Sequence, residues 1–381
     1  MKQTTWLNTA IRRRSVLALA VSGLAGCGGG AAGGGFLAGL PGTGGTGLFA
    51  QGTIIGFGSV IVNGIRFDDT AASVQIDGLS ASAQDLRLGM VADVQGLRGA
   101  DLTLGVANAI EVWSIAQGLV SQVQSGQFKV AGMLVQADAA TVFDGISSVS
   151  ALANGLRVAV WGLESGTDGS RWTATRVALV TATPMVCTGI VTATGTLNGF
   201  ALSGQSVSSL RAGQLVWVQG VLSSSGTSLQ VDSFKLLGLQ GSSLPQGEVE
   251  IEGLVTALLS GSRFMLGSVE VDASGASLAT SYKALAIGQR IEVEGIWQGG
   301  VLKAGSLGVE SEEKLDEAEI EAKIEQFTSL ANFVVRGQRC NASSATISKG
   351  TVSDLKVGVK VKLHGTKAGD VLMVTTLEFS S

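Results

Sequence analysis

A motif of eleven residues recurs five times along this chain of 381 residues, and it constrains the fold more than any other feature. Every copy begins with leucine, has glycine at its fourth and eleventh positions, and carries an alternating apolar run between the two glycines. The copies span residues 86–96, 152–162, 210–220, 285–295 and 355–365. Self-similarity of this kind indicates tandem copies of one small structural unit. The sequence therefore predicts an array of five units.

The pattern inside the motif is that of a β-strand with one buried face. Side chains two and four positions before the final glycine share a face, because the side-chain period of a strand is two. These positions are apolar in every copy, from Ala92 and Val94 in the first to Val361 and Leu363 in the last. We expect the first glycine of the motif to adopt a positive φ in a turn, and the last to lie at a bulge or a tight exit.

The residues on either side of the motif predict further strands in each unit. A glycine between two short apolar runs indicates a hairpin before the motif, and in the third unit we place this hairpin at residues 202–207. Another apolar run comes after the motif in every unit. Pro184 and Pro245 fall between units, as expected where strands are absent. We therefore predict an all-β fold, with about five OB-like β-barrels or curled sheets in tandem.

This alignment also gives the unit boundaries. The five repeats are expected at residues 51–114, 115–183, 185–240, 247–310 and 311–381, and the third is shortened. Residues 312–327 have the composition of a helix. However, residues 317–324 align without gaps on residues 248–255, which open the fourth repeat. We therefore expect a strand from about residue 318.

Residues 1–27 have the features of an export signal and are not expected to join the fold. A basic segment precedes a short apolar run, and Leu24-Ala25-Gly26-Cys27 resembles the lipobox of bacterial lipoproteins. The alternatives are a chance cysteine after an ordinary signal peptide and an N-terminal membrane helix, for which the apolar run is too short. The resemblance implies that Cys27 is lipidated and becomes the membrane anchor. Gly28 stands where the inner-membrane retention signal has aspartate, which implies an outer-membrane lipoprotein facing the periplasm or the cell surface.

Residues 28–50 are expected to form a flexible tether between the anchor and the repeats. This stretch contains eleven glycines and one proline, Pro41. Such a composition buries too little apolar surface to fold, and a tether of this length reaches roughly 25 Å.

The first repeat identifies a family resemblance. Residues 52–68 and the motif at 86–96 resemble the bacterial domain-of-unknown-function 5666 repeats. Those repeats occur in tandem on exported proteins and are related to OB-type barrels, so the resemblance implies a β-barrel fold and a location in the cell envelope. The family has no assigned catalytic residues, and the resemblance implies no site.

The charge of the chain argues against a nucleic-acid partner. The net charge is −4, and the leader contributes four cations and no acid, so the remainder carries −8. OB barrels that bind single strands use a basic groove and stacking aromatic rings. Here aromatic residues make up 5% of the chain, and no basic cluster comes after Arg14. A negative surface suits solubility or weak attraction for cations and basic partners.

Residues for catalysis or for metal binding are scarce. The single histidine, His364, lies on the outward face of the last motif strand, and no Gly-x-Ser-x-Gly segment is present. No His and Cys spacing fits a zinc site, and Asp68, Asp69 and Asp168 are better explained as turn residues than as calcium ligands. We therefore expect no catalytic residue, metal or cofactor, and no enzymatic activity. Cys187 and Cys340 lie in different repeats, and we expect both to be free thiols.

Two tryptophans are the candidate interaction residues. Trp161 and Trp217 occupy outward positions of the motif strand, where other repeats carry polar residues. Large aromatic side chains outside a core usually contact another surface. They are expected either to pack between repeats or to form a platform for a ligand such as a glycan.

The sequence favours a non-catalytic outer-membrane lipoprotein that binds or scaffolds in the cell envelope. Its partner would be an unknown envelope protein or polysaccharide. The alternatives are a glycan- or polymer-binding surface protein and, less favoured, an enzyme.

Overall fold

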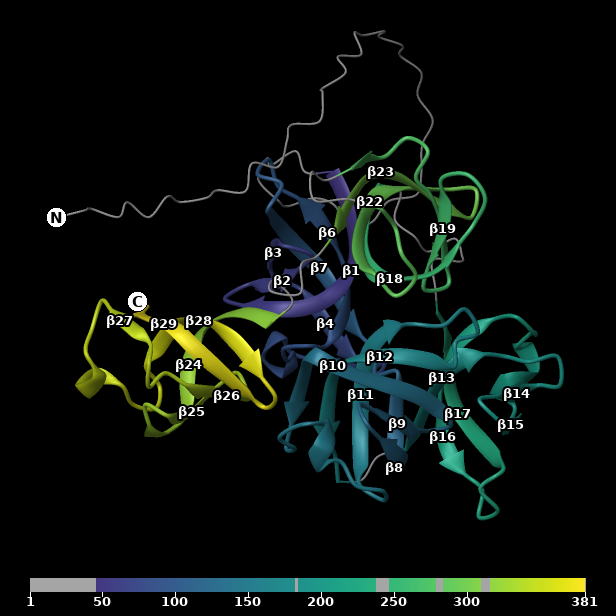
Figure 1. The fold of residues 1–381 in the computed structure, drawn as a ribbon, viewed down its shortest axis with the longest axis horizontal. Coiled ribbons are helices and arrows are strands. Elements are labelled where there is room, and N and C mark those ends of the chain that lie inside the picture. Colours follow the sequence, from purple (N-terminus) through teal and green to yellow (C-terminus); the bar gives the residue numbers. More distant parts are fainter. Residues whose placement is uncertain (1–45, 182–183, 238–246, 279–283, 310–315, 381) are drawn as a thin grey trace, which may run out of the picture. The chain divides into compact units, whose positions relative to one another are not determined.

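The computed structural model describes residues 46–181, 184–237, 247–278, 284–309 and 316–380. These residues form short antiparallel and parallel β-ladders joined by tight turns and 3-10 helices (Figure 1). The ladders group into five small barrels, so the expected all-β array of OB-like repeats is confirmed. None of the described segments is a helix of sufficient length and apolarity to span a bilayer. Cys27 and tether residues 28–45 lie outside the described part of the chain.

Barrel 1 shows the strand order that the other repeats share. Antiparallel ladders join β1 to β2 and β6, β2 to β3, and β6 to β7, and a parallel ladder between β3 and β7 closes the barrel. This order, with its one parallel closure, is that of an OB fold. Two short strands pair beside β7. The strands are β1 (Thr46–Phe57), β2 (Val60–Val62), β3 (Ile65–Asp68), β4 (Ser73–Ile76), β5 (Leu79–Ala81), β6 (Val91–Arg98) and β7 (Leu104–Val112).

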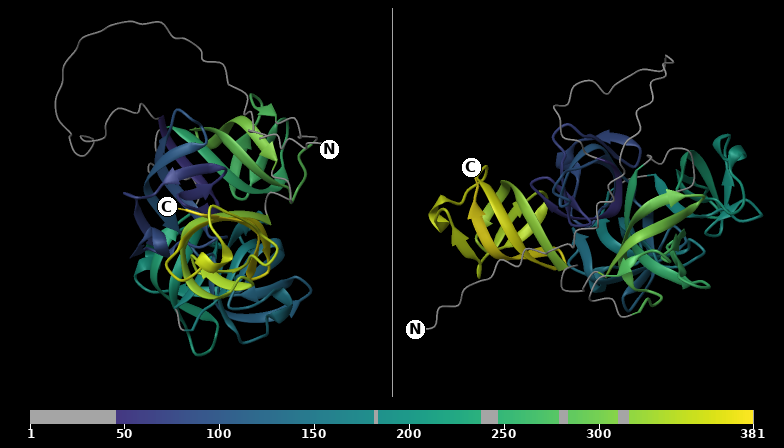
Figure 2. Two further views of the ribbon diagram at one scale, coloured as in Figure 1. Left: turned by 90° about the vertical axis from the view of Figure 1, so that its left-hand side faces the viewer. Right: turned by 90° about the horizontal axis from the view of Figure 1, so that it is seen from above.

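Barrels 2, 4 and 5 repeat this order, each with a parallel ladder between its third strand and its last. The strands of barrel 5 (yellow) curl around a common axis in Figure 2. Barrel 2 consists of β8 (Ala116–Gln124), β9 (Gln127–Val130), β10 (Met133–Asp144), β11 (Arg157–Glu164) and β12 (Arg171–Leu179). Barrel 4 consists of β18 (Glu248–Leu258), β19 (Arg263–Leu266), β20 (Val269–Asp272), β21 (Ser277–Leu278), β22 (Arg290–Gln298) and β23 (Val301–Val309). Barrel 5 consists of β24 (Glu317–Ser329), β25 (Asn332–Val335), β26 (Gln338–Asn341), β27 (Thr346–Ser348), β28 (Lys360–Ala368) and β29 (Val371–Phe379).

Barrel 3 is the shortened copy, and its hairpin is not where the sequence predicted it. The turn is formed by Asn198 and Gly199, both with positive φ, rather than within residues 202–207. Asn-Gly is a strong signal for a two-residue turn because both residues tolerate positive φ. The strands are β13 (Met185–Ile190), β14 (Thr196–Leu197), β15 (Phe200–Ser203), β16 (Leu215–Leu222) and β17 (Ser228–Leu236).

The motif strand has the buried face that its alternation predicts. The side chains two and four positions before the final glycine are 0% exposed in all five barrels. Short 3-10 helices precede the motif in four barrels: η1 (Ala83–Asp85), η2 (Val149–Ala151), η3 (Ser206–Ser209) and η4 (Val352–Asp354).

The two motif glycines have the separate roles that the sequence suggested. The first glycine has a positive φ in all five copies, between 80° and 89°. At the last glycine, the register between the motif strand and the next strand shifts in every barrel. A Cβ atom there would lie 1.9 to 2.4 Å from a backbone carbonyl oxygen of the neighbouring strand. These bulges therefore require glycine for space as well as for backbone conformation.

The first strand of barrel 1 begins earlier than the sequence predicted, and the first strand of barrel 5 begins close to its predicted position. The first strand begins at Thr46, so the expected tether is too long at its C-terminal end. Leu48, Phe49 and Ala50 are buried there, because they pack in the apolar core despite the glycine-rich sequence around them. The strand expected from about residue 318 is confirmed, since β24 begins at Glu317.

A pair of glycine variants in barrel 4 tests the two roles. Gly288→Ala places a side chain at positive φ in open space and is expected to destabilise the barrel by about 1–2 kcal/mol. Gly295→Ala drives a methyl group against the Lys303 carbonyl and is expected to cost about 3 kcal/mol or more. Hydrogen exchange of β22 and β23 measures both effects. Equal protection in the two variants would contradict the bulge argument.

Candidate functional site

Strand pairing joins barrels that lie far apart in the sequence. Along β1, residues 48–51 pair in parallel with residues 248–251 of β18, and residues 56–57 pair with residues 319–320 of β24. Barrels 2 and 3 are joined by a short antiparallel pairing between β8 and β13. The backbone ladders from barrel 1 to barrels 4 and 5 therefore both start from the single strand β1.

A buried ion-pair cluster lies at the junction of barrels 1 and 4. Arg98, at the end of β6, forms ion pairs with Glu250 and, at 3.2 Å from Nε, with Glu248. A third carboxylate, Glu294, lies 3.7 Å from its Nη2. The side chains of Arg98 and Glu250 are 2% and 0% exposed. The three carboxylates are spaced closely enough to hold a cation, and the Arg98 guanidinium group lies within ion-pair distance of all three.

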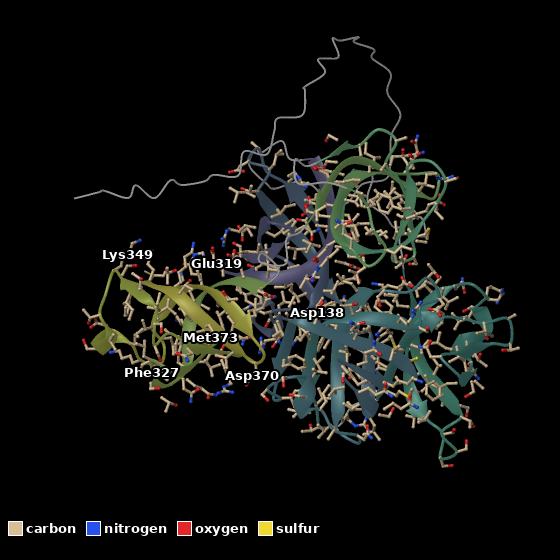
Figure 3. The ribbon with its side chains drawn as sticks, viewed as in Figure 1. Asp138, Glu319, Phe327, Lys349, Asp370 and Met373 are labelled. Carbon is tan, nitrogen blue, oxygen red and sulfur yellow. The ribbon has the colours of Figure 1, made fainter. Side chains whose placement is uncertain are left out.

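The junction of barrels 1 and 5 uses the equivalent glutamate. Arg66 Nη2 bonds to Glu319 Oε1 at 2.6 Å, and Lys362 Nζ lies 3.0 Å from the same oxygen. Glu319 is labelled in Figure 3, and it aligns with Glu250 in the fourth repeat. His364 is about half exposed, with its Nε2 3.3 Å from Glu319 Oε2. The one histidine thus takes part in a charged surface group at this junction.

Both candidate tryptophans are buried between barrels. Trp217 is 2% exposed, donates a hydrogen bond from Nε1 to the Ser114 carbonyl at 2.9 Å, and meets Trp113 edge to face at 5.0 Å. Trp161 is 6% exposed, belongs to the apolar cluster that contains the core of barrel 1, and lies 6.0 Å from the Arg176 guanidinium. The structure brings each ring against a neighbouring barrel, and it does not bring the two rings together. Neither ring is open to a ligand.

The contacts of the candidate cysteines and aspartates indicate structural roles. Cys187 and Cys340 are free and buried, and burial raises the pKa of each thiol to about 12. Asp68 Oδ1 accepts hydrogen bonds from the backbone and hydroxyl of Thr70, and Asp168 accepts one from the Ser170 backbone. These are contacts of turn residues.

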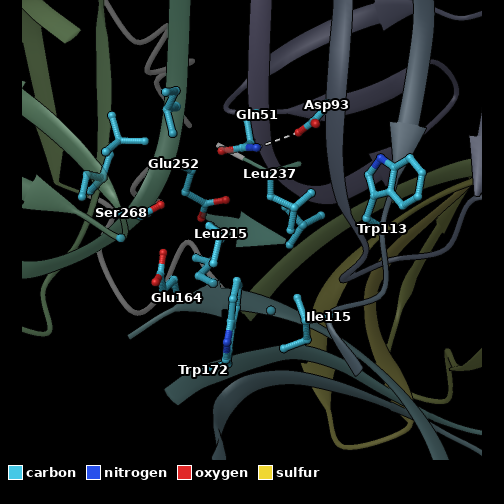
Figure 4. Close-up of a pocket in the computed structure, with 18 of the residues that line it drawn as sticks. Gln51, Asp93, Trp113, Ile115, Glu164, Trp172, Leu215, Leu237, Glu252 and Ser268 are labelled. Atoms are coloured by element: carbon cyan, nitrogen blue, oxygen red, sulfur yellow. Dashed lines mark hydrogen bonds between the residues drawn. The ribbon is translucent and has the colours of Figure 1, made fainter. Parts of the chain in front are cut away.

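A cavity of about 520 Å³ is lined by residues of barrels 1, 2, 3 and 4 (Figure 4). Its apolar wall includes Phe49, Trp113 and Trp172. Figure 4 shows Glu164 beside Ser268, with Trp172 and Ile115 around the same space. Four acidic side chains contribute to the lining: Asp93, Glu111, Glu164 and Glu252.

Two of the four acids are paired with cations. Glu111 forms an ion pair with Lys235, and Glu252 forms one with Arg290 and accepts a hydrogen bond from the Thr53 backbone at 2.7 Å. Burial alone would raise the pKa of Glu252, but the charge and hydrogen bond of Arg290 outweigh it and hold the pKa below its ordinary value. These two acids are therefore compensated within the protein.

The other two acids have no paired cation among the described residues; Glu164 is buried and Asp93 is half-buried. Asp93 accepts a hydrogen bond from Gln51 Nε2 at 2.7 Å, and burial raises its pKa. Glu164 is 7% exposed, and burial raises its pKa to about 7 despite a hydrogen bond from Ser268. Its Oε1 atom has no hydrogen-bond partner in the part of the chain that the structure describes. An unpartnered, buried carboxyl oxygen is costly, because no hydrogen bond replaces its lost hydration.

The charged residues at these junctions share a sequence position that the motif analysis missed. Arg98, Glu164 and Lys367 each lie two residues after the final glycine of a motif, and all three are buried. Lys367 Nζ donates to the Ala140 carbonyl of barrel 2 at 3.4 Å, and burial lowers its pKa to about 8. In the sequence, these three positions could have been recognised as charged residues within an otherwise regular strand.

Comparison with curated protein sequences gives no match. A solved structure titled "drosophila Unr CSD456" is 13% identical over 45% of this chain and 79% of that chain. Its TM-score is 0.15, which is too low for the likeness to bear on fold or function.

A family model matches three segments of the chain. The family is described as "Domain of unknown function (DUF5666)", and the matches span residues 117–178, 252–307 and 321–374. These segments are barrels 2, 4 and 5, and barrel 1 shares their strand order. The resemblance drawn from the sequence is thus confirmed: the chain is a tandem-repeat protein in which three segments match the domain-of-unknown-function 5666 family.

Proposed function

We propose that this protein is a non-catalytic lipoprotein of the bacterial cell envelope, anchored in the outer membrane through Cys27. Its barrels serve as a scaffold that binds an envelope partner. The observation that carries this proposal is the use of charged and aromatic side chains at the junctions. Arg98, Arg66 and Trp217 each join one barrel to another, so these side chains hold small domains together. Such domains are marginally stable alone.

Several observations favour binding over catalysis. Among the described residues, His364 pairs with Glu319, and both thiols are buried with raised pKa values. The cavity holds acids and aromatic rings, and the lysine that lines it is paired with Glu111. Burial of Trp161 and Trp217 removes the basis for a glycan platform on those two rings, so a glycan-binding function is not proposed. An acidic chain with a paired lysine in its cavity also disfavours a nucleic-acid partner.

The anchor is tested by substitution of the lipobox cysteine. Cys27→Ala is expected to abolish incorporation of a fatty-acid label and to release the protein from the membrane fraction, because a diacylated cysteine supplies the attachment. Cys187→Ala, which alters a buried thiol, is the control and should leave labelling unchanged. Membrane retention of Cys27→Ala would contradict the anchor. Protease digestion of intact and permeabilised cells then shows whether the barrels face the outside of the cell or the periplasm. The partner is expected on the same side.

The scaffold is tested at Arg98. Arg98→Ala leaves the fully buried Glu250 without its cation, and loss of one partner of a buried pair typically costs about 3–5 kcal/mol. Hydrogen exchange should therefore accelerate along β1 and β18, where the two barrels pair. Arg263→Ala removes an exposed pair within barrel 4 and is expected to cost less than about 1 kcal/mol. Similar exchange in both variants would contradict a structural role for the cluster.

The same cluster predicts a pH dependence. Burial and the neighbouring Glu294 and Glu250 carboxyl groups raise the pKa of Glu248 to about 8. The positive charge of Arg98 opposes this rise. A glutamate in the unfolded chain ionises near about 4.3, so the folded state binds this proton more tightly. The stabilisation of the folded state by this proton is complete below about pH 4.3. It is lost as the pH rises through about 8, at up to about 1.4 kcal/mol per pH unit.

Thermal unfolding between about pH 6 and pH 9 measures this effect. Glu248→Gln should flatten the decline in melting temperature, because the glutamine has no proton to lose. Glu317→Gln changes the exposed equivalent in barrel 5 and should keep the slope of the parent. An unchanged slope in Glu248→Gln would overturn the assignment.

A further inference from the structure

The cavity has the size and lining of a small-molecule site. Its volume of about 520 Å³ falls within the range of about 300–1,000 Å³ that is common for ligand pockets. Such pockets combine a mainly apolar wall with a few polar groups that fix orientation. Here the apolar wall includes Trp113, Trp172 and Leu254, and the polar groups include four acids.

The uncompensated charge in this space is negative. Glu111 and Glu252 have cations of the protein itself, but Asp93 and Glu164 have no paired cation in the described residues. Glu164 lines the cavity and is more than nine-tenths buried, and its Oε1, which has almost no accessible surface, lies without a described hydrogen-bond donor. A ligand in the cavity with N–H groups and a positive charge would interact favourably with the Glu164 and Asp93 carboxyl groups.

One ammonium group of the protein already lies between a carboxylate and an aromatic ring in this cavity. The Lys235 ammonium group is paired with Glu111 and lies 4.2 Å from the centre of the Trp113 ring. A primary ammonium therefore fits between a carboxylate and an indole in these surroundings. Trp172 and Glu164 line the same cavity and offer the same two groups.

We infer that this cavity is a binding site for a small organic ammonium ion with an apolar body. The Glu164 carboxylate accepts the N–H groups, Asp93 contributes a second negative charge, and the apolar portion packs on the tryptophan and leucine wall. Burial raises the pKa of Glu164 to about 7, and a bound cation would lower this pKa by favouring the ionised form. The inference rests on the binding role proposed above and adds the chemical class of the ligand.

Isothermal titration of the full-length, detergent-solubilised protein with phenethylamine tests the inference. At neutral pH the amine is a cation, and 2-phenylethanol is its uncharged control of similar size. We expect saturable binding of one amine per chain and at least about tenfold weaker binding of the alcohol. Glu164→Gln keeps the side-chain shape but removes the charge, and it should weaken amine binding by about 10- to 100-fold, as expected for a lost charged hydrogen bond.

The control variants separate the possible outcomes. Glu317→Gln, on the exposed start of β24, should bind the amine as the parent does, and Asp93→Asn should weaken binding independently of Glu164→Gln. Absence of amine binding in the parent would overturn the inference. Equal binding of amine and alcohol, or unchanged amine binding in both cavity variants, would also overturn it. The envelope scaffold would survive each of these failures, because its tests depend on Cys27 and Arg98.

Discussion

The bulge at the final glycine of each motif is the constraint on which the rest of the structure depends. At this point the next strand approaches so closely that its carbonyl oxygen lies 1.9 to 2.4 Å from where a Cβ atom would be. The bulge shifts the register of the motif strand against its neighbour, and bulges of this kind bend and twist strands. Short strands can therefore curl into closed barrels. Each of the five barrels has one such bulge at its copy of the glycine.

The residues just beyond the bulge determine how the barrels are joined. Two residues after the glycine, barrels 1, 2 and 5 carry Arg98, Glu164 and Lys367, each buried at a contact with another barrel or at the cavity. Barrel 1 adds its long strand β1, which pairs with both β18 and β24. Burying these charges is costly unless they are paired, and Arg98 is paired with several carboxylates. Lys367 donates to a backbone carbonyl, whereas Glu164 has no paired cation among the described residues and contributes a carboxyl group to the cavity.

Much of the fold could be predicted from the sequence because it depends on local pattern. The alternation in the motif predicted the buried face, the glycine spacing predicted the turn and the bulge, and the alignment of residues 317–324 on 248–255 correctly outweighed helix propensity. The start of β1 was misplaced because Leu48 and Phe49 lie in a glycine-rich stretch whose composition masks two buried side chains. The hairpin of the third repeat was misplaced because the alignment was preferred to the Asn198-Gly199 turn signal.

The candidate site was harder to predict because its residues come from repeats that are distant in the sequence. Nothing in the local pattern of Glu164 or Asp93 indicates that both line one cavity, and strand pairing between barrels 1 and 4 has no signature in either repeat alone. Trp161 and Trp217 were recognised as unusual, and packing between barrels was one of the two roles considered for them. Only the structure shows that each ring is covered by a neighbouring barrel.

The central claim is that the barrels are joined through β1 instead of being independent domains on a string. Residue-resolved hydrogen exchange along residues 48–51 and 248–251 tests it most directly. These strands have ladder partners on both sides, β6 and β18 for the first and β1 and β22 for the second, so every amide in both segments should exchange slowly. Fast exchange at alternate amides, as on an open strand edge, would show that the barrels are not paired and would contradict the account.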